Sequence, residues 1–225
     1  MSDTDSFIDE VTEEVKRDQF YGMLRKYGWI VALVIVLIVG GAAFSEYRKA
    51  QARAVAEGLG DQILTSLAAE SPADRQTDLE AIATPAIGGQ TIVAFLAAAE
   101  AQQAGDIDQA VALLEMISVN GDVELVYRQI AAFKSLVLQA DTMDADARRQ
   151  QLDALAVPGA PLSLLAQEQL ALMDVAQGQT DAAIERFQNI IQDAGVSSDL
   201  QQRALQVIVA LGGTPEYANL PDLGN

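Results

Sequence analysis

Three aspartates in the segment QADTMDADARR form the densest group of potentially reactive side chains in the sequence. Asp141, Asp144 and Asp146 have the chemistry to bind Ca²⁺ or to act as a paired acid and base. A calcium loop of the D-x-D-x-D-G type also needs a glycine at its sixth position and a distal glutamate, and neither stands at that spacing. We therefore interpret the segment as a turn between helices, in which Asp144 or Asp146 caps the next helix.

The chain contains no cysteine and no histidine. This excludes disulfides, thiol nucleophiles, Cys/His zinc sites and histidine general bases. The pairs Gly88-Gly89 and Gly212-Gly213 lack the G-x-G-x-x-G or Gly-Lys-Ser/Thr context of a phosphate-binding loop. We predict no catalytic, cofactor-binding or metal-binding residues, and we expect the protein not to be an enzyme.

One uncharged apolar run, GWIVALVIVLIVGGAAF, extends from Gly28 to Phe44. As a helix it would be about 25 Å long, close to the hydrocarbon core of about 30 Å. A cleaved signal peptide would begin with a short basic segment, and a buried core helix would rarely be apolar on all sides. Tyr27, Trp29 and Tyr47 suit the two membrane interfaces. We predict a transmembrane anchor at residues 28–45.

The anchor separates an acidic head, residues 1–27, from a much longer body. Four basic residues precede the run closely and three follow it, which only slightly favours a cytoplasmic head. In the head we expect a short amphipathic helix, whose apolar face consists of Phe7, Ile8, Val11 and Val15. Within the anchor, Gly41 and Ser45 form a small-xxx-small pair that could pack on another helix.

The body is strongly acidic. Ten lysines and arginines and 25 aspartates and glutamates follow the anchor, and the whole chain has a formal net charge of −18. Such a body repels nucleic acid and anionic lipid, so we exclude nucleic-acid binding and peripheral membrane binding. An acidic solvated surface is the simpler interpretation of this charge, and an affinity for basic or unfolded clients is the other.

The body is rich in Ala, Leu, Gln and Glu, which favour helices. After a helix ending near residue 69 and a short helix through 79–82, we expect helices over 91–104, 107–117, 123–140, 145–156, 162–177, 182–193 and 196–211. The turns of the three hairpins lie at Gly105, Asp141 and Gly178, 36 and 37 residues apart. Hairpins repeated at about 34 residues are typical of tetratricopeptide solenoids.

Two of the hairpin turns share a pattern. The segments AEAQQAGDIDQAVALLEMI and LMDVAQGQTDAAIERFQNI align on Gly105 and Gly178. We expect each glycine to end the first helix in a left-handed cap. The alanine five positions on lets the helices approach, and the large apolar residue four positions later fills the space beneath. These residues are Ala110 and Leu114 in the first copy and Ala183 and Phe187 in the second.

The array departs from the full repeat pattern, because the usual Trp, Gly and Tyr of the first helix are missing and the middle unit has no turn glycine. Independent helix packing is the alternative. The predicted fold is all-α. It has a single N-terminal transmembrane helix, a tetratricopeptide-like α-solenoid over residues 46–211 with a terminal capping helix, and a flexible tail over 212–225.

The whole arrangement resembles the YfgM-like proteins, ancillary subunits of the bacterial Sec translocon. The resemblance depends on the short head, the single span ending in small residues, the exit Glu46-Tyr47-Arg48, the long Ala-rich helix and the weak hairpin repeats. It implies a bacterial inner-membrane protein with a cytoplasmic N-terminus and a periplasmic C-terminal domain. It also implies association with the SecYEG translocon and with a membrane-anchored periplasmic chaperone of the prolyl-isomerase type.

We therefore expect a protein-interaction module, an adaptor that links emerging exported polypeptides to periplasmic chaperones. The alternative is a helical-repeat scaffold for another envelope machine, such as cell division or cytochrome maturation. The first helices of the hairpins line the concave surface of such stacks, and Gln102, Arg128, Lys134 and Gln169 are its candidate exposed residues. An ordinary solvated surface is the alternative for these four. The sequence leaves the oligomeric state and the client proteins open.

Overall fold

The computed structural model describes the backbone of residues 3–216 and the side chains of residues 25–30 and 32–216. Over this part of the chain every regular element is a helix and no strand occurs, which confirms the all-α prediction. The helices are α1 (Asp3–Leu67), α2 (Pro72–Glu80), α3 (Ile87–Ala104), α4 (Ile107–Val119), α5 (Leu125–Leu138), α6 (Ala145–Leu155), α7 (Ser163–Ala176), α8 (Thr180–Gln192) and α9 (Ser198–Ala210).

The chain falls into two units, residues 1–58 and 59–225. In its described part the first unit consists of residues 3–58 of α1, which include the backbone of the head from residue 3 onward, and residues 59–67 of the same helix belong to the second unit. The side chains expected to form the apolar face of the head, Phe7, Ile8, Val11 and Val15, lie outside the described residues.

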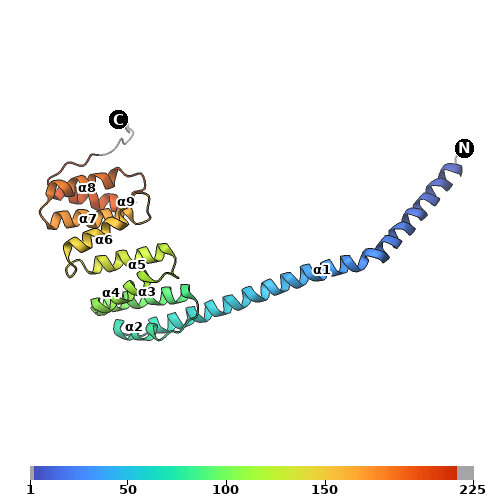
Figure 1. The fold of residues 1–225 in the computed structure, drawn as a ribbon, viewed down its shortest axis with the longest axis horizontal. Coiled ribbons are helices and arrows are strands. Elements are labelled where there is room, and N and C mark those ends of the chain that lie inside the picture. Colours follow the sequence, from blue (N-terminus) through green and yellow to red (C-terminus); the bar gives the residue numbers. More distant parts are fainter. Residues whose placement is uncertain (1–2, 217–225) are drawn as a thin grey trace. The chain divides into compact units, whose positions relative to one another are not determined.

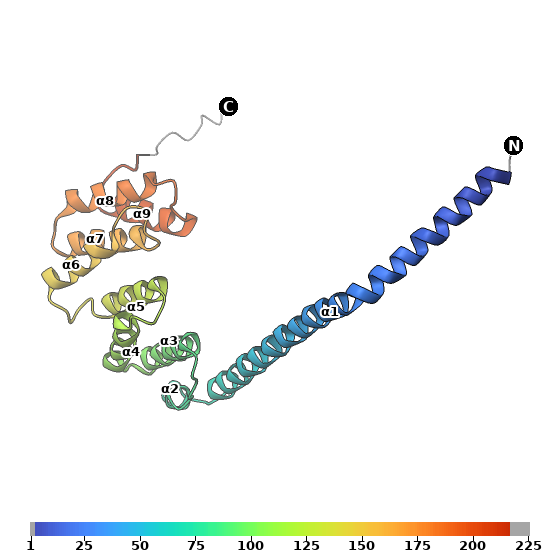
Figure 2. The same cartoon turned by 45° about the vertical axis from the view of Figure 1, so that its right-hand side comes forward.

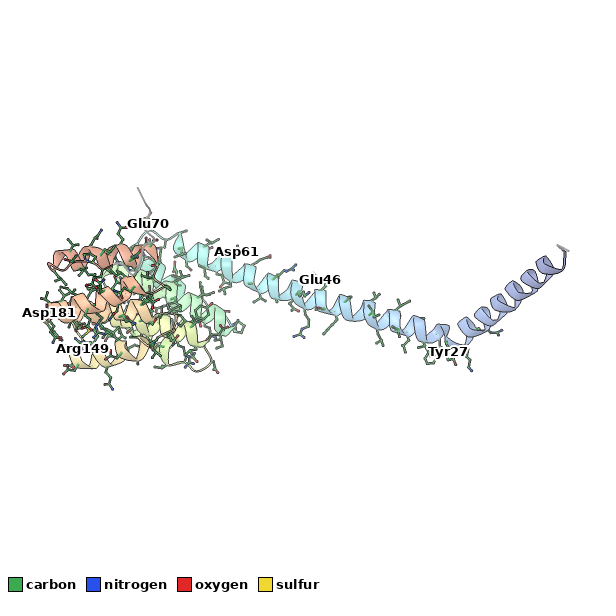
Figure 3. All side chains as sticks on the ribbon, turned by 90° about the horizontal axis from the view of Figure 1, so that it is seen from above. Tyr27, Glu46, Asp61, Glu70, Arg149 and Asp181 are labelled. Carbon is green, nitrogen blue, oxygen red and sulfur yellow. The ribbon has the colours of Figure 1, made fainter. Side chains whose placement is uncertain are left out.

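No described residue of the apolar run in α1 is buried. Side chains extend outward along the helix between Tyr27 and Glu46 (Figure 3), and Trp29 and Val36 are 67% and 66% exposed. Within Arg25–Leu67 the helix is long and apolar enough to cross a membrane. A run of this length that is apolar on every side does not suit a soluble surface.

In the second unit each helix from α2 to α9 packs against the next one in the chain (Figures 1 and 2). The core consists of three clusters. The first lies among α2, α3, α4 and the facing side of α5, includes Leu79, Leu114 and Ala131, and is joined by the last turns of α1. The second joins α5, α6 and α7 through Leu136, Leu152 and Leu170. The third lies among α7, α8 and α9 around Phe187.

The two turn glycines have the predicted left-handed conformation, with φ angles of 85° at Gly105 and 73° at Gly178. The backbone N–H groups that follow them close the preceding helices, because Asp106 donates to the carbonyl of Ala101 at 2.9 Å and Gln179 donates to that of Asp174 at 2.8 Å. Ala110, Ala183, Leu114 and Phe187 are all buried. The predicted caps and the predicted burial of these residues are thus confirmed.

The cap predicted before α6 is confirmed at Asp144, and the serine pair Ser197-Ser198, which the sequence offers as the cap of the last helix, provides one at Ser197. Asp144 accepts a hydrogen bond from the Ala147 N–H at 3.0 Å, and Ser197 accepts one from the Leu200 N–H at 3.3 Å. The three aspartates of the 141–146 segment thus belong to an inter-helix turn and the start of α6. Asp144 has the structural role expected for it.

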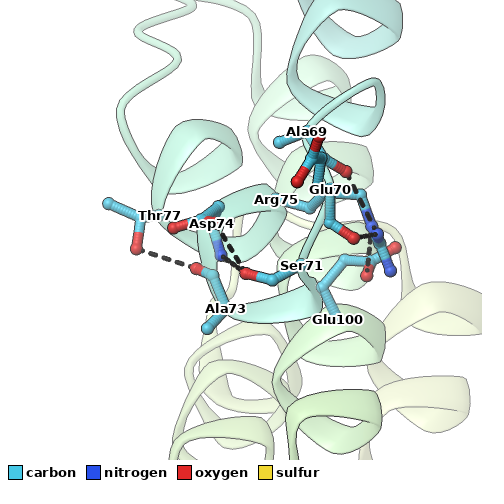
Figure 4. Close-up of polar contacts among 8 residues, drawn as sticks. All are labelled: Ala69, Glu70, Ser71, Ala73, Asp74, Arg75, Thr77 and Glu100. Atoms are coloured by element: carbon cyan, nitrogen blue, oxygen red, sulfur yellow. Dashed lines mark hydrogen bonds and ion pairs between the residues drawn. The ribbon is translucent and has the colours of Figure 1, made fainter.

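Asp74, an aspartate that follows the break Ser71-Pro72, is the cap that the sequence predicts for α2, but this prediction is wrong. Ser71 is the N-cap, and it accepts from the Asp74 N–H at 3.1 Å while its hydroxyl donates to Asp74 Oδ2 at 2.7 Å (Figure 4). The physical reason is Pro72, whose fixed φ and missing N–H suit the first helical position. The cap therefore falls on the residue before the proline, and Asp74 closes the first turn.

The expected start of the next helix is also wrong. The sequence predicts that the pair Gly88-Gly89 ends the preceding helix and that the next helix begins at residue 91, but α3 begins at Ile87 and includes both glycines. Gly89 is buried, and a Cβ atom there would lie 2.9 Å from both Leu59 Cδ2 and Thr84 Oγ1. At Gly88 a Cβ would meet nothing within 4 Å. Gly89 thus permits a close approach inside the helix rather than a break in the chain.

This contrast predicts opposite effects of the same substitution at neighbouring positions. Gly89→Ala is expected to lower the free energy of unfolding by about 1–3 kcal/mol, because the added methyl overpacks a buried contact. Gly88→Ala is expected to raise it by up to about 1 kcal/mol, because alanine restricts the unfolded chain without a clash. Urea unfolding of the detergent-solubilised chain, followed by far-UV circular dichroism, measures both, and equal effects would contradict this assignment.

Candidate partner-binding surface

The first helices of the three hairpins, α3, α5 and α7, carry the four residues predicted to meet a partner. Gln102 and Lys134 are exposed, as expected. The expectation is wrong for the other two, which are half-buried. Gln169 accepts a hydrogen bond from Arg148 Nη2 at 3.0 Å. The Nε of Arg128 is buried and has no hydrogen-bond partner.

Five arginine side chains connect helices of the second unit. Arg75 in α2 donates from Nε to Glu100 of α3 at 2.8 Å. Its Nη1 donates to the carbonyls of Ala69 and Glu70 at 3.2 and 3.3 Å, beyond the end of α1 (Figure 4). One guanidinium therefore holds the segment after α1, the helix α2 and the helix α3 together.

Arg148 connects the middle of the stack. It is only 6% exposed, and its Nε donates to the carbonyl of Leu136 in α5 at 2.8 Å while Nη2 reaches Gln169 in α7. Burial lowers the pKa of the Arg148 guanidinium, and the charge of Asp141 partly opposes this shift. A guanidinium stays protonated in proteins, so these bonds persist over the ordinary pH range.

Asp174 in α7 is shared by two arginines. Its Oδ1 lies 2.7 Å from Arg149 Nη2 of α6, and its Oδ2 lies 2.9 Å from Arg186 Nε of α8. The carboxylate is 2% exposed. Burial by itself raises the pKa of Asp174, but the hydrogen bonds and charges of Arg149 and Arg186 outweigh it, so this pKa lies below its ordinary value.

Arg203 joins the last helix to the stack. Its Nε and Nη2 donate to the two carboxylate oxygens of Glu168 in α7 at 2.8 and 3.0 Å, which is a bidentate pair. The hydrogen bonds to Glu168 raise the pKa of Arg203 above its ordinary value. The terminal helix α9 is thus fixed by charge as well as by the apolar cluster around Phe187.

These connections leave the outer surface of the second unit acidic. Of the seven lysines and arginines between residues 59 and 216, five form the contacts above, and only Arg128 and Lys134 are left over. Of the 22 acidic residues in the same range, only Glu100, Glu168 and Asp174 form ion pairs. The field outside the body therefore attracts cations.

A hollow of about 320 Å³ lies between the start of α3 and the start of α5. Its lining is mostly apolar, with two carboxylates from the segment that leads into α5. The lining residues are Ile87, Gly88, Thr91, Ile92, Phe95, Asp122, Val123, Glu124 and Tyr127. Sequence reasoning missed this groove. Ile92 gave a signal, because it is a large apolar residue outside the inner positions that the sequence predicts for helix 91–104, which are Val93, Leu96, Ala97 and Ala101.

Where the structure describes side chains, no three His, Cys, Asp or Glu residues are placed to hold a metal ion. The most buried carboxylate, Asp174, is occupied by two arginines. Comparisons with known protein families, curated proteins and solved structures found no match to this chain.

Proposed function

We propose that the protein is a membrane-anchored protein-interaction module. The observation that carries the proposal is α1, a helix that is long and apolar enough to cross a membrane and whose last turns belong to the core of the second unit. Leu59, Ile63 and Leu67 pack against the first core cluster. In the proposal the run crosses the membrane as the anchor and the body presents a surface to other proteins.

The body is proposed to be a tetratricopeptide-like solenoid in which α3 with α4, α5 with α6 and α7 with α8 are the hairpins and α9 is the terminal cap. Sequential packing with a segmented core supports this, because in repeat arrays each unit contacts only its neighbours. The left-handed Gly105 and Gly178, each followed by a buried alanine and a buried large residue, support it further.

The proposed location and partners follow from the resemblance to YfgM-like proteins. The anchor would lie in a bacterial inner membrane, with the head in the cytoplasm and the body in the periplasm. The protein would act as an adaptor between the SecYEG translocon, emerging polypeptides and a membrane-anchored prolyl-isomerase-type chaperone. The acidic outer surface of the body supports contact with basic client segments.

We also propose that the protein is not an enzyme. A carboxyl group that acts as a general acid near neutral pH needs a raised pKa. The pKa of Asp174, the most buried carboxyl in the described part of the chain, is instead lowered by Arg149 and Arg186. Arg149 and Arg186 connect Asp174 to the neighbouring helices, so we assign this carboxylate a role in the stability of the fold.

The topology is tested by single-cysteine labelling, which the cysteine-free sequence makes unambiguous. Asp181→Cys places a thiol on the exposed surface of the body (Figure 3), and Ser2→Cys places one in the head. A membrane-impermeant maleimide added to intact spheroplasts should label Asp181→Cys but should label Ser2→Cys only after lysis. Labelling of the head alone in intact spheroplasts would contradict a periplasmic body.

The partners are tested by affinity purification of the full chain from membranes in mild detergent. We expect a Sec channel component and a periplasmic chaperone in the purified complex, and neither with an unrelated single-span protein carrying the same tag. Complexes that contain neither a Sec channel component nor a periplasmic chaperone would refute the adaptor. A complex with cell-division or cytochrome-maturation proteins would favour the scaffold.

A further inference from the structure

We infer that the groove between α3 and the start of α5 binds a polypeptide segment in which large apolar side chains stand next to lysine or arginine. The inference rests on the proposed function and deepens it, because it names the surface and the chemical class of its occupant. The argument depends on the lining of the groove, on the apolar side chains around it and on the charges at its rim.

The lining is apolar and accessible. Ile87, Ile92 and Tyr127 line the groove and are 36%, 54% and 45% exposed. Phe95 and Val123 complete it, and Val123 also belongs to the first core cluster. The wall nearest the core is therefore fixed by packing. A hollow of about 320 Å³ with such walls suits a few large apolar side chains.

The groove is part of a wider apolar surface. Leu125 and Val126 stand beside Tyr127 in the first turn of α5 and are 60% and 38% exposed. Together with Ile87 and Ile92 they make five large, exposed apolar residues in two short stretches of the chain. Apolar residues scattered singly over a surface need no explanation, whereas a group of this kind marks an interaction site.

The rim is acidic. Asp122 and Glu124 line the groove, and neither forms an ion pair with the side chains that the structure describes. The nearest basic residue along the chain, Arg128, follows Glu124 by one helical turn and has a buried Nε. The arginines of α2, α6, α8 and α9 are held in their own contacts. An occupant with cations beside its apolar residues therefore complements the groove.

Charge also decides against the other occupants. A second copy of this chain would bring another strongly acidic body against an acidic rim. The C-terminal residues 217–225 contain Asp222 and no lysine or arginine, so they do not complement the rim either. Anionic lipid is repelled by the same carboxylates. A basic and apolar segment of a partner or client polypeptide is the occupant that satisfies both the walls and the rim.

The test uses the full chain in nanodiscs of neutral phospholipid and three fluorescent peptides, with empty nanodiscs as the background. One peptide places leucines between arginines, the second replaces the leucines by serine, and the third replaces the arginines by glutamate. Fluorescence anisotropy should show binding of the first peptide with a Kd at least about tenfold below those of the other two. Equal affinities, or no binding of the first peptide, would overturn the inference.

Variants then place the binding at the groove. Gly88→Phe puts a ring into it from a helical position where a Cβ meets nothing within 4 Å, so the fold should be retained while the Kd rises roughly tenfold or more. Ile92→Ser and the pair Asp122→Lys with Glu124→Lys should raise it as well. The matched controls Val209→Ser and Asp153→Lys alter exposed residues on α9 and α6 and should leave it unchanged.

If Gly88→Phe binds the first peptide as tightly as the unaltered chain, the groove is not the site. The peptide assay and the purification of native complexes can fail independently. Native complexes that contain the Sec channel and a chaperone, together with peptide binding that ignores the groove variants, would refute the groove alone. Groove-dependent binding without those partners would refute the adaptor alone.

Discussion

Replacing Asp174 by alanine is expected to lower the free energy of unfolding by about 3 kcal/mol. The carboxylate is 2% exposed and holds Arg149 of α6 and Arg186 of α8 at 2.7 and 2.9 Å. Removing one member of a buried ion pair costs about 3–5 kcal/mol, because the remaining charge loses its partner. The side chains of Arg149 and Arg186 are 25% and 34% exposed, so water partly solvates their charges once the carboxylate is gone. The lower end of that range therefore applies.

Urea unfolding of the detergent-solubilised chain measures this loss, with Asp153→Ala as the matched control. Asp153 lies on α6, is exposed and forms no ion pair with a described residue. Its replacement should change the free energy of unfolding by no more than about 0.5 kcal/mol. If the two variants were equally stable, the contacts of Asp174 with Arg149 and Arg186 would contribute nothing to the free energy of unfolding.

The same carboxylate predicts a dependence of stability on pH. The pKa of Asp174 is lower in the folded chain than in the unfolded chain, where an aspartate has a pKa of about 3.9. The unfolded state therefore binds a proton first as the pH falls, and the stabilisation is complete above about pH 4 and is lost below it. The difference in stability between the unaltered chain and Asp174→Asn should shrink below that pH. A difference that grew on acidification would contradict the direction of the shift.

The fold was predictable where local physics decides it. The turns at Gly105 and Gly178 need a left-handed residue, and the 3.6-residue periodicity placed Ala110, Leu114 and Phe187 inside. The apolar run is readable from composition alone. The first turn of α3 could not be predicted from the sequence. Glycine is required at position 89 because of a close contact with Leu59, thirty residues earlier in the chain, and the sequence of a glycine pair inside a helix looks the same as that of a break.

The candidate surface was less predictable because its features arise between distant residues. Arg149 and Asp174 are 25 residues apart, and Arg203 and Glu168 are 35 apart. These ion pairs therefore cannot be predicted from the i, i+4 spacing within one helix. Arginine is almost never fully buried unless paired, which is why the near-complete burial of Arg148 was unexpected. The groove depends on a space between α3 and α5, and sequence periodicity identifies helix faces but not the gaps between helices.

The second large effect is expected from Phe187→Ala, which should cost about 3–5 kcal/mol. Phe187 is completely buried in the cluster that joins α7, α8 and α9, in contact with a set of aliphatic side chains. Alanine would leave a cavity where a ring now fills the space beneath the helix crossing at Ala183. Phe187→Leu keeps most of the volume and should cost less, at about 1–1.5 kcal/mol. Phe133→Ala, at a half-buried aromatic of α5, is the matched control and should also cost less.

The destabilisation caused by Phe187→Ala is expected to be local to one end of the second unit. The cluster around Phe187 and the cluster around Leu114 share no residue. If the second unit is the proposed repeat array, a local defect destabilises mainly the helices next to it. Amide hydrogen exchange in Phe187→Ala should therefore accelerate in α8 and α9 while α3 and α4 keep their protection. The groove between α3 and α5 should then still bind the leucine–arginine peptide. Equal acceleration of amide exchange in α3, α4, α8 and α9, together with loss of peptide binding, would contradict this expectation. It would mean that the second unit unfolds cooperatively as a whole and that its core is not segmented.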